Sequence, residues 1–194
     1  MYGSMLAQLN EAQLQRLLLR FDEDLARGVR AQGCPNCQGV LHAAPYPRKP
    51  RGTAAPLSLE YCMQFSFCCA VEGCRHRATP PSLRFLGPKV YWAAVVVLIS
   101  AMRCGATPTR LRSLKELVGV SRQTALRWQT WWQRALPQSP FWRACRGAFR
   151  STVQIGELPR SLLEQFAGTV QERLLALLYF LAPLTGGRRS ARSM

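Results

Sequence analysis

The stretches that decide the fold are Cys34-Pro35-Asn36-Cys37 and Cys69-Ala70-Val71-Glu72-Gly73-Cys74. A two-residue spacing lets one tight turn direct two thiolates at a single tetrahedral metal ion, and the second pair completes a set of four ligands. Between the pairs, residues 61–67 alternate apolar and polar side chains, which predicts a strand. The pattern therefore predicts a small β zinc ribbon spanning residues 33–86, with zinc held by Cys34, Cys37, Cys69 and Cys74.

Alternatives to this ligand set remain open. Cys68 also precedes Cys74, but adjacent residues of a strand face opposite ways, and Cys69 is the preferred ligand. His42 or His76 could replace one thiolate, and unligated buried cysteines are the simplest alternative to a metal site. The remaining thiols, Cys62, Cys104 and Cys145, are expected to be buried. A site closed by four protein ligands leaves no position for a substrate, so we expect its role to be structural.

Positive charge is concentrated in the middle of the chain. The sequence carries 26 Lys and Arg against 10 Asp and Glu, a formal charge of +16. Residues 100–150 contain ten of the basic residues and one acid, Glu116. Such a field attracts phosphate backbones and releases their counterions, although a solvated basic surface is an equal alternative for charge alone.

The strongest helical signal lies in residues 107–136. Thr107-Pro108 can begin a helix, and a Gly119-Val120-Ser121 turn follows it, with Ser121 as the cap of a second helix. The second helix is expected to direct Ala125, Trp128 and Trp132 inward. Arg122, Gln123 and Arg127 then project outward, as in a recognition helix.

These outward residues suit double-stranded DNA. Arg bonds guanine and Gln bonds adenine in the major groove, while the hydroxyls of Ser121 and Thr124 suit phosphates. The predicted DNA-binding residues are Ser121, Arg122, Gln123, Thr124, Arg127, Arg110, Arg112 and Arg134. The alternative is an ordinary helical hairpin with basic solvent-exposed faces.

The string LKELVGVSRQTALRW, residues 114–128, resembles the helix-turn-helix of bacterial regulators and transposases. Lys115 and Ala125 depart from the residues usual at their positions. Together with the cysteine pairs, residues 33–136 resemble the DNA-binding region of insertion-sequence transposases and their small accessory proteins. The resemblance implies a sequence-specific DNA-binding accessory protein of a mobile element, which recognises its ends or represses its own promoter.

A catalytic centre is not expected in this chain. The nuclease site of transposases needs three carboxylates, whereas the only aspartates here are Asp22 and Asp24. Chemistry would then come from a transposase, recombinase or nuclease encoded nearby. Two other functions remain open: a structural adaptor that docks through its C-terminal helices into a nucleoprotein assembly, and an RNA or single-strand binder.

The rest of the chain predicts helices, so the expected fold is mainly α with a small β zinc ribbon, a helix-turn-helix bundle and C-terminal helices. Helices are expected from Asn10 to Gly28, over 90–102, and near 141–148, 159–167 and 169–182. The expected units are an N-terminal helix (1–32), the ribbon (33–86), the helix-turn-helix domain (87–136) and a C-terminal helical region (137–194) ending in a disordered basic tail.

The apolar runs 90–102 and 174–184 are shorter than the roughly 20 residues of a bilayer helix and predict buried core helices. Residues 22–24 form the one acidic patch, either solvated or packed on a basic neighbour. The start of the chain lacks the pattern of a secretion signal, so we expect a cytoplasmic, nucleoid-associated protein. A homodimer through the C-terminal helices is one option.

Overall fold

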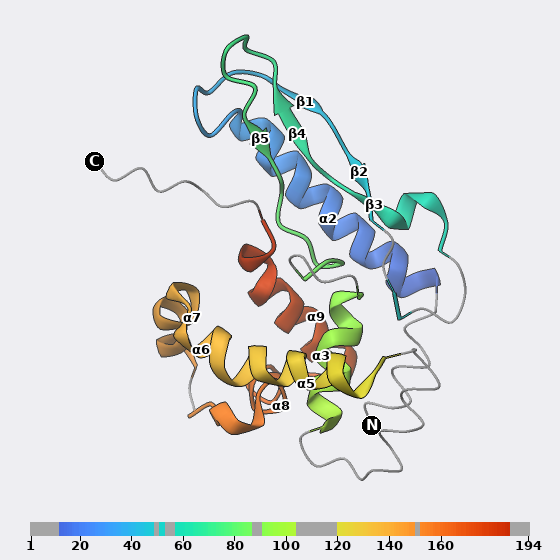
Figure 1. Ribbon diagram of the computed structural model, residues 1–194, viewed down its shortest axis with the longest axis vertical. Helices are drawn as coiled ribbons and strands as arrows, with labels where there is room; N and C mark the ends of the chain where they lie inside the picture. The colour runs from blue at the N-terminus through green and yellow to red at the C-terminus, as the bar shows by residue number, and fades with distance from the viewer. Residues whose placement is uncertain are drawn as a thin grey trace.

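The long amphipathic helix α2 (Ala12–Gln32) joins the two parts of the molecule (Figure 1). The computed structural model describes residues 12–48, 51–52, 57–86, 91–103, 120–149 and 152–186. Leu14 and Leu18 of α2 are buried in a large helical core, whereas Ala26, two turns later, belongs to the small core of the cysteine-rich part. The expected fold class is confirmed: mostly helical, with small antiparallel sheets.

The predicted end of this first helix at Gly28 is wrong. The helix continues to Gln32 and is followed by Gly33, whose φ of 74° is the left-handed conformation that commonly ends a helix. Gly28 lacks this conformation and lies within the helix, where an added Cβ would meet nothing within 4 Å. Gly33 therefore directs the chain out of α2 and into the first cysteine pair.

The cysteine-rich part contains two antiparallel sheets. The larger has the strand order β1 (Leu41–Ala43), β4 (Phe67–Cys69), β5 (Arg77–Ala78), with Leu41 opposite Cys69 and Cys68 opposite Arg77. The smaller pairs β2 (Tyr46–Pro47) with β3 (Met63–Gln64). Strand β4 is the centre of the larger sheet and places Cys69 at its end.

The single strand predicted over residues 61–67 is only partly correct. The chain forms a 3-10 turn, η1 (Leu59–Cys62), and then two short strands, β3 and β4. The carbonyl oxygens of Tyr61 and Met63 accept hydrogen bonds from the guanidinium of Arg84, at 3.0 and 2.8 Å. The predicted strand is divided because β3 pairs with β2, whereas β4 pairs with β1 and β5 in the other sheet.

The helical part is built around α3 (Ala93–Arg103), which contacts α5, α8 and α9. Residues 93–101 of α3 are all buried, so the expectation of a core helix is confirmed. Among the described residues, no helix is both long and apolar enough to cross a membrane. The remaining elements are α5 (Arg122–Thr130), the π turn η2 (Trp131–Ala135), α6 (Leu136–Gln138), α7 (Pro140–Cys145), η3 (Arg146–Ala148), η4 (Ile155–Glu157), α8 (Arg160–Leu163), α9 (Val170–Leu181) and η5 (Ala182–Leu184).

Helix α9 turns its apolar face into the chain's own core. Thr169 caps it in a reciprocal capping box with Glu172, and the buried positions follow helical spacing. The apolar run 174–184, predicted to form a buried core helix, is thus largely packed within the molecule. Its buried residues are Leu174, Leu177, Leu178 and Leu181.

Candidate metal centre and basic helix face

Four thiols from two turns meet in one cluster. The Sγ atoms of Cys34, Cys37, Cys69 and Cys74 all lie within 4.8 Å of one another. The Sγ of Cys34 is 3.8 Å from that of Cys74, and the Sγ of Cys37 is 3.5 Å from that of Cys69. Bond lengths of about 2.3 Å in a tetrahedral zinc–thiolate site place sulfur atoms about 3.8 Å apart. The cluster therefore has the donor atoms and nearly the spacing to hold a metal ion.

Backbone geometry forms the first turn of the cluster. The carbonyl of Cys34 accepts from the Gln38 N–H at 2.8 Å, and the Cys34 N–H donates to the Gly39 carbonyl at 2.9 Å. Gln38 takes a left-handed φ of 62° to close the turn. Asn36 donates its backbone N–H to the Cys34 Sγ and its side-chain amide to the Cys74 Sγ, both at 3.4 Å. These hydrogen bonds would orient and stabilise thiolate ligands.

The second turn connects β4 to β5. Gly73 has a φ of 80°, and Arg75 a φ of 42°, so the chain reverses within a few residues. The Cys69 N–H donates to the His76 carbonyl at 2.9 Å, and the Ala70 N–H donates to the Val40 carbonyl at 2.9 Å. The second pair of cysteines is thereby held against the strand that follows the first pair.

The structure separates the two adjacent cysteines of β4. Cys69 is fully buried in the cluster, whereas the half-buried Cys68 thiol points to the carbonyl oxygens of Cys69 and Arg75. Neither His42 nor His76 belongs to the cluster. The expectation that the other thiols are buried is wrong for Cys62 and Cys145, which are half-buried, and Cys104 lies outside the described residues.

Gly39 is a site residue that sequence reasoning missed. A Cβ built on it would lie 2.4 Å from the Val71 side chain and 3.3 and 3.4 Å from the sulfurs of Cys37 and Cys69. A side chain at this position would have to displace the Val71 side chain and would crowd the converging sulfurs. The signal available in the sequence was a glycine two residues after the Cys-x-x-Cys pair.

The thiols of the cluster differ in acidity. Burial raises the pKa of Cys69 from 9.0 to about 12. Hydrogen bonds from the Asn36 side chain and the His76 backbone lower the pKa of Cys74 from 9.0 to about 6. In the metal-free protein at neutral pH, Cys74 is therefore a thiolate, and Cys69 must lose a proton before it can bind a metal.

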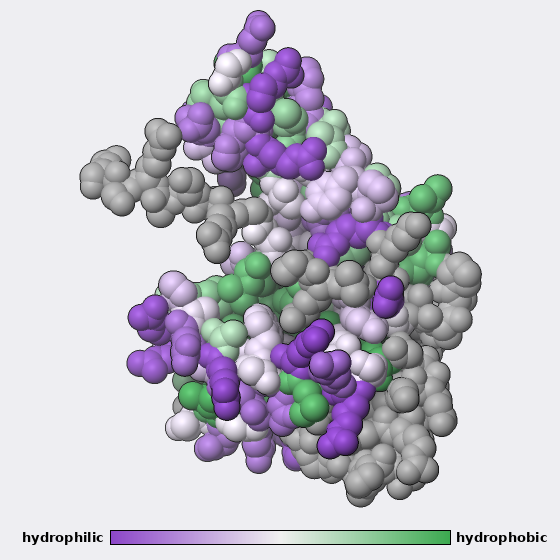
Figure 2. Space-filling model, viewed as in Figure 1, coloured by the Kyte–Doolittle hydropathy of each residue, from purple (hydrophilic) through white to green (hydrophobic). Residues whose placement is uncertain are grey.

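Helix α5 presents a basic outer face. Ser121 caps it by accepting the Thr124 N–H at 3.1 Å, as predicted. Ala125, Trp128 and Trp132 are buried, also as predicted. The outer side chains of Arg122, Gln123 and Arg127 are exposed, and Figure 2 shows hydrophilic side chains gathered over this helix.

The structure describes some of the other predicted DNA-binding residues and leaves others outside the described part of the chain. Arg134 is exposed on η2, whereas Arg110 and Arg112 lie outside the described residues, as does the first helix expected for the helix-turn-helix. The Ser121 hydroxyl is 3.0 Å from the Thr124 hydroxyl, so these two groups form a polar pair at the start of α5. Residues 120–149 contain five Arg and no Asp or Glu.

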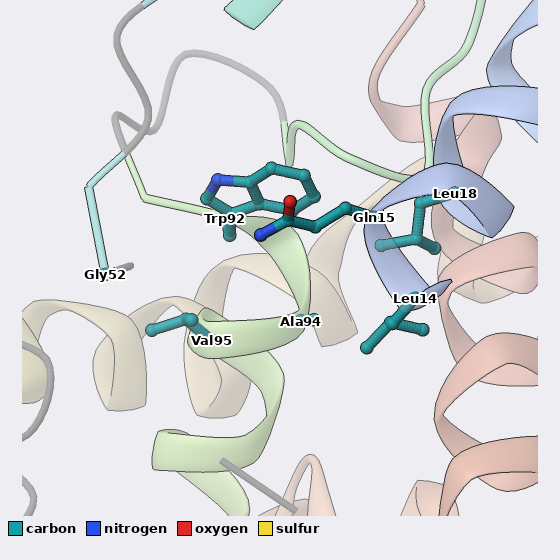
Figure 3. Close-up of a pocket in the computed structure, with 7 residues that line it drawn as sticks. All are labelled: Leu14, Gln15, Leu18, Gly52, Trp92, Ala94 and Val95. Atoms are coloured by element: carbon teal, nitrogen blue, oxygen red, sulfur yellow. The ribbon is translucent and has the colours of Figure 1, made fainter. Parts of the chain in front are cut away.

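A small pocket lies between α2 and the start of α3 (Figure 3). Gln15 and Trp92 border it, and its other lining residues are apolar or glycine: Leu14, Leu18, Gly52, Ala94 and Val95. Among the described residues, no titratable or nucleophilic side chain lines it.

Comparisons with known proteins identify no family for this chain. No family model, no curated protein and no solved structure matches it. The metal-binding potential of the cluster therefore rests on its geometry alone.

Proposed function

We propose that the protein is a zinc-stabilised, sequence-specific binder of double-stranded DNA in which α5 lies in the major groove. One observation carries the proposal: the helix buries an aromatic face while its opposite, exposed face offers Arg122, Gln123 and Arg127. Guanidinium and amide groups at the start of a helix are the groups that bond guanine and adenine edges.

Charge supports this proposal. Residues 120–149 carry five Arg and no Asp or Glu, and such a surface repels other cationic surfaces and attracts phosphates. Exposed Arg143 and Arg146 follow on α7 and η3, so the positive field extends beyond α5. Such residues would contact the DNA backbone and add affinity without reading sequence.

Zinc is the proposed occupant of the cysteine cluster. Four thiolates in a closed tetrahedral arrangement suit zinc, and such sites supply folding free energy to segments with small hydrophobic cores. Among the described residues, the buried core around this cluster is small: Ala26, Cys34, Leu41, Phe67, Cys69 and Ala78. Zinc would hold the ribbon together, and the chemistry of any reaction on DNA would belong to a partner protein.

The setting in a mobile element rests on the resemblance of residues 33–136 to transposase DNA-binding regions. Within that setting the chain would recognise element ends or its own promoter. An adaptor role has less support, because the leucines of α9 that would dock a partner are buried within the chain.

The test is selection of a duplex from a random-sequence library by the zinc-loaded protein, followed by affinity measurement across salt concentrations. We expect the logarithm of the binding constant to fall linearly with the logarithm of the salt concentration. Each phosphate contact should add about 0.9 to the steepness of this slope. Arg127→Ala and Gln123→Ala should each weaken binding by about 1–3 kcal/mol for the selected duplex.

The controls are Arg20→Ala and Gln171→Ala, which change exposed residues on α2 and α9. They should leave discrimination between the selected and a scrambled duplex unchanged. A flat salt response, or equal effects of the α5 variants and their controls, would refute the proposal. Displacement of the bound duplex by single strands but not by competitor duplex would favour a single-strand binder.

A further inference from the structure

One exposed residue on the outer face of α5 does not fit a purely polar surface. Leu126 is an apolar side chain that is 43% exposed, and its neighbours on this face are cationic and amide side chains. The exposed residues of α5 form one stripe: Arg122, Gln123, Leu126, Arg127 and Thr130. Figure 2 shows a small hydrophobic patch among the hydrophilic side chains over this helix.

Leu126 is the centre of this stripe. It follows Arg122 by four residues and Gln123 by three, and residues at these spacings are neighbours on a helix surface. Thr130 lies one turn later in the stripe, and its hydroxyl donates to the Leu126 carbonyl at 3.1 Å. The Thr130 hydroxyl proton is therefore used within the helix. A duplex that meets Arg122 and Gln123 would therefore also meet the Leu126 side chain.

The major groove contains one apolar group on its base edges, the C5 methyl of thymine. A leucine in the groove cannot form hydrogen bonds with bases, and opposite a polar edge it would displace water without replacing its hydrogen bonds. Opposite a thymine methyl, both apolar groups leave water together. We infer that Leu126 reads a thymine methyl next to the bases contacted by Arg122 and Gln123; the inference rests on the proposed function and specifies part of its target.

A protein partner is a poorer fit to this leucine. A specific interface buries about 800 Å² on each side, usually around an apolar centre, whereas Leu126 is flanked by Arg122 and Arg127. A protein docked on this face would have to remove water from the two charged arginines, which is costly. It would gain only the burial of one leucine side chain.

The experiment replaces thymines of the selected duplex, one at a time, by deoxyuridine, which pairs identically but lacks the methyl. We expect one position, next to the Gln123 or Arg122 contact, at which the replacement weakens binding by the zinc-loaded protein about three- to fivefold, the effect of losing one buried methyl contact. Leu126→Ala should bind thymine and deoxyuridine duplexes equally at that position. Alanine favours helix, so this exposed variant should stay folded.

The matched control is Leu59→Ala, which truncates another leucine, 77% exposed, on η1. It should retain the preference for thymine. Tight duplex binding with no deoxyuridine-sensitive position, or a preference that survives in Leu126→Ala, would overturn the inference and leave the proposed function standing. Absence of duplex binding by the unchanged protein would overturn both.

Discussion

Asp22 and Arg84 form a salt bridge in which both side chains are fully buried, with the Arg84 Nε 2.8 Å from an Asp22 carboxylate oxygen. Asp22 lies on α2, and Arg84 lies after the cysteine-rich part, 62 residues later. The same carboxylate accepts the Ser82 hydroxyl at 2.5 Å and the Leu83 N–H at 2.6 Å. Together with the Arg84 hydrogen bonds to Tyr61 and Met63, this network joins α2, the ribbon and the entry to the helical part.

Removal of one partner of this pair should be strongly destabilising. Asp22→Ala leaves the Arg84 guanidinium buried without its anion, and such changes cost about 3–5 kcal/mol. Urea unfolding should show this loss in the free energy of unfolding. Asp24→Ala is the control, because Asp24 forms an exposed pair with Arg27, worth at most about 1 kcal/mol. Equal losses in the two variants would contradict the structural role of the network.

Zinc content should depend on Cys69 and not on its neighbour Cys68. Purified protein is expected to carry one zinc ion per chain, because a single four-thiol cluster is present among the described residues. Cys69→Ser removes a ligand and should abolish tight zinc binding, as elemental analysis after gel filtration would show. Cys68→Ser should retain the full zinc content. Loss of zinc in Cys68→Ser together with full zinc content in Cys69→Ser would show that Cys68, and not Cys69, is the ligand.

Gly39→Ala should weaken metal binding without touching a ligand. The added methyl would overlap the Val71 side chain and press on the sulfurs of Cys37 and Cys69. Competition with a chromogenic chelator should show a zinc affinity at least about tenfold lower, within the range seen when groups supporting the ligands are lost.

The control for this variant is Gly28→Ala. An added Cβ meets nothing within 4 Å there, and alanine favours the helix interior by roughly 1 kcal/mol. This variant should keep its zinc affinity and gain stability. Unchanged zinc affinity in Gly39→Ala would show that the turn adjusts freely around the methyl.

Thiol reactivity in the metal-free protein should follow the two shifted pKa values. Alkylation requires the thiolate, so Cys74, with a pKa of about 6, should react rapidly at pH 7. Its reactivity should fall as the pH drops through about 6. Cys69, with a pKa of about 12 and no exposed surface, should react last. Mass spectrometry of briefly alkylated protein would give the order.

The lowered pKa of Cys74 also makes the stability of the metal-free protein depend on pH. Its folded-state pKa lies below the ordinary value of 9.0, so the Cys74 thiolate stabilises the metal-free fold fully above pH 9, and this contribution is lost as the pH falls through about 6.

In the alkylation experiment, zinc should protect both thiols across the neutral range. Equal alkylation rates of Cys69 and Cys74 would contradict the arrangement of hydrogen bonds around the cluster.

Local patterns in the sequence were sufficient to predict much of this protein. The cysteine spacings predicted a four-thiol cluster, because a turn needs only a few residues to direct two sulfurs together. The start of α5 at Ser121 and its buried face followed from capping and from the 3.6-residue period, which are also local. These features depend on neighbours within one or two turns of chain.

Tertiary structure decided the features that depend on distant partners. The acidic patch at residues 22–24 left open whether it is solvated or packed on a basic neighbour. Tertiary structure buries Asp22, because the charge that makes this burial tolerable comes from Arg84, 62 residues away. The strand predicted over 61–67 is divided because its two halves pair with different strands, Met63–Gln64 with β2 and Phe67–Cys69 with β1 and β5. Side-chain type and spacing determined the cluster and the basic helix, whereas long-range hydrogen bonds and packing decided where the chain bends and which apolar faces are buried.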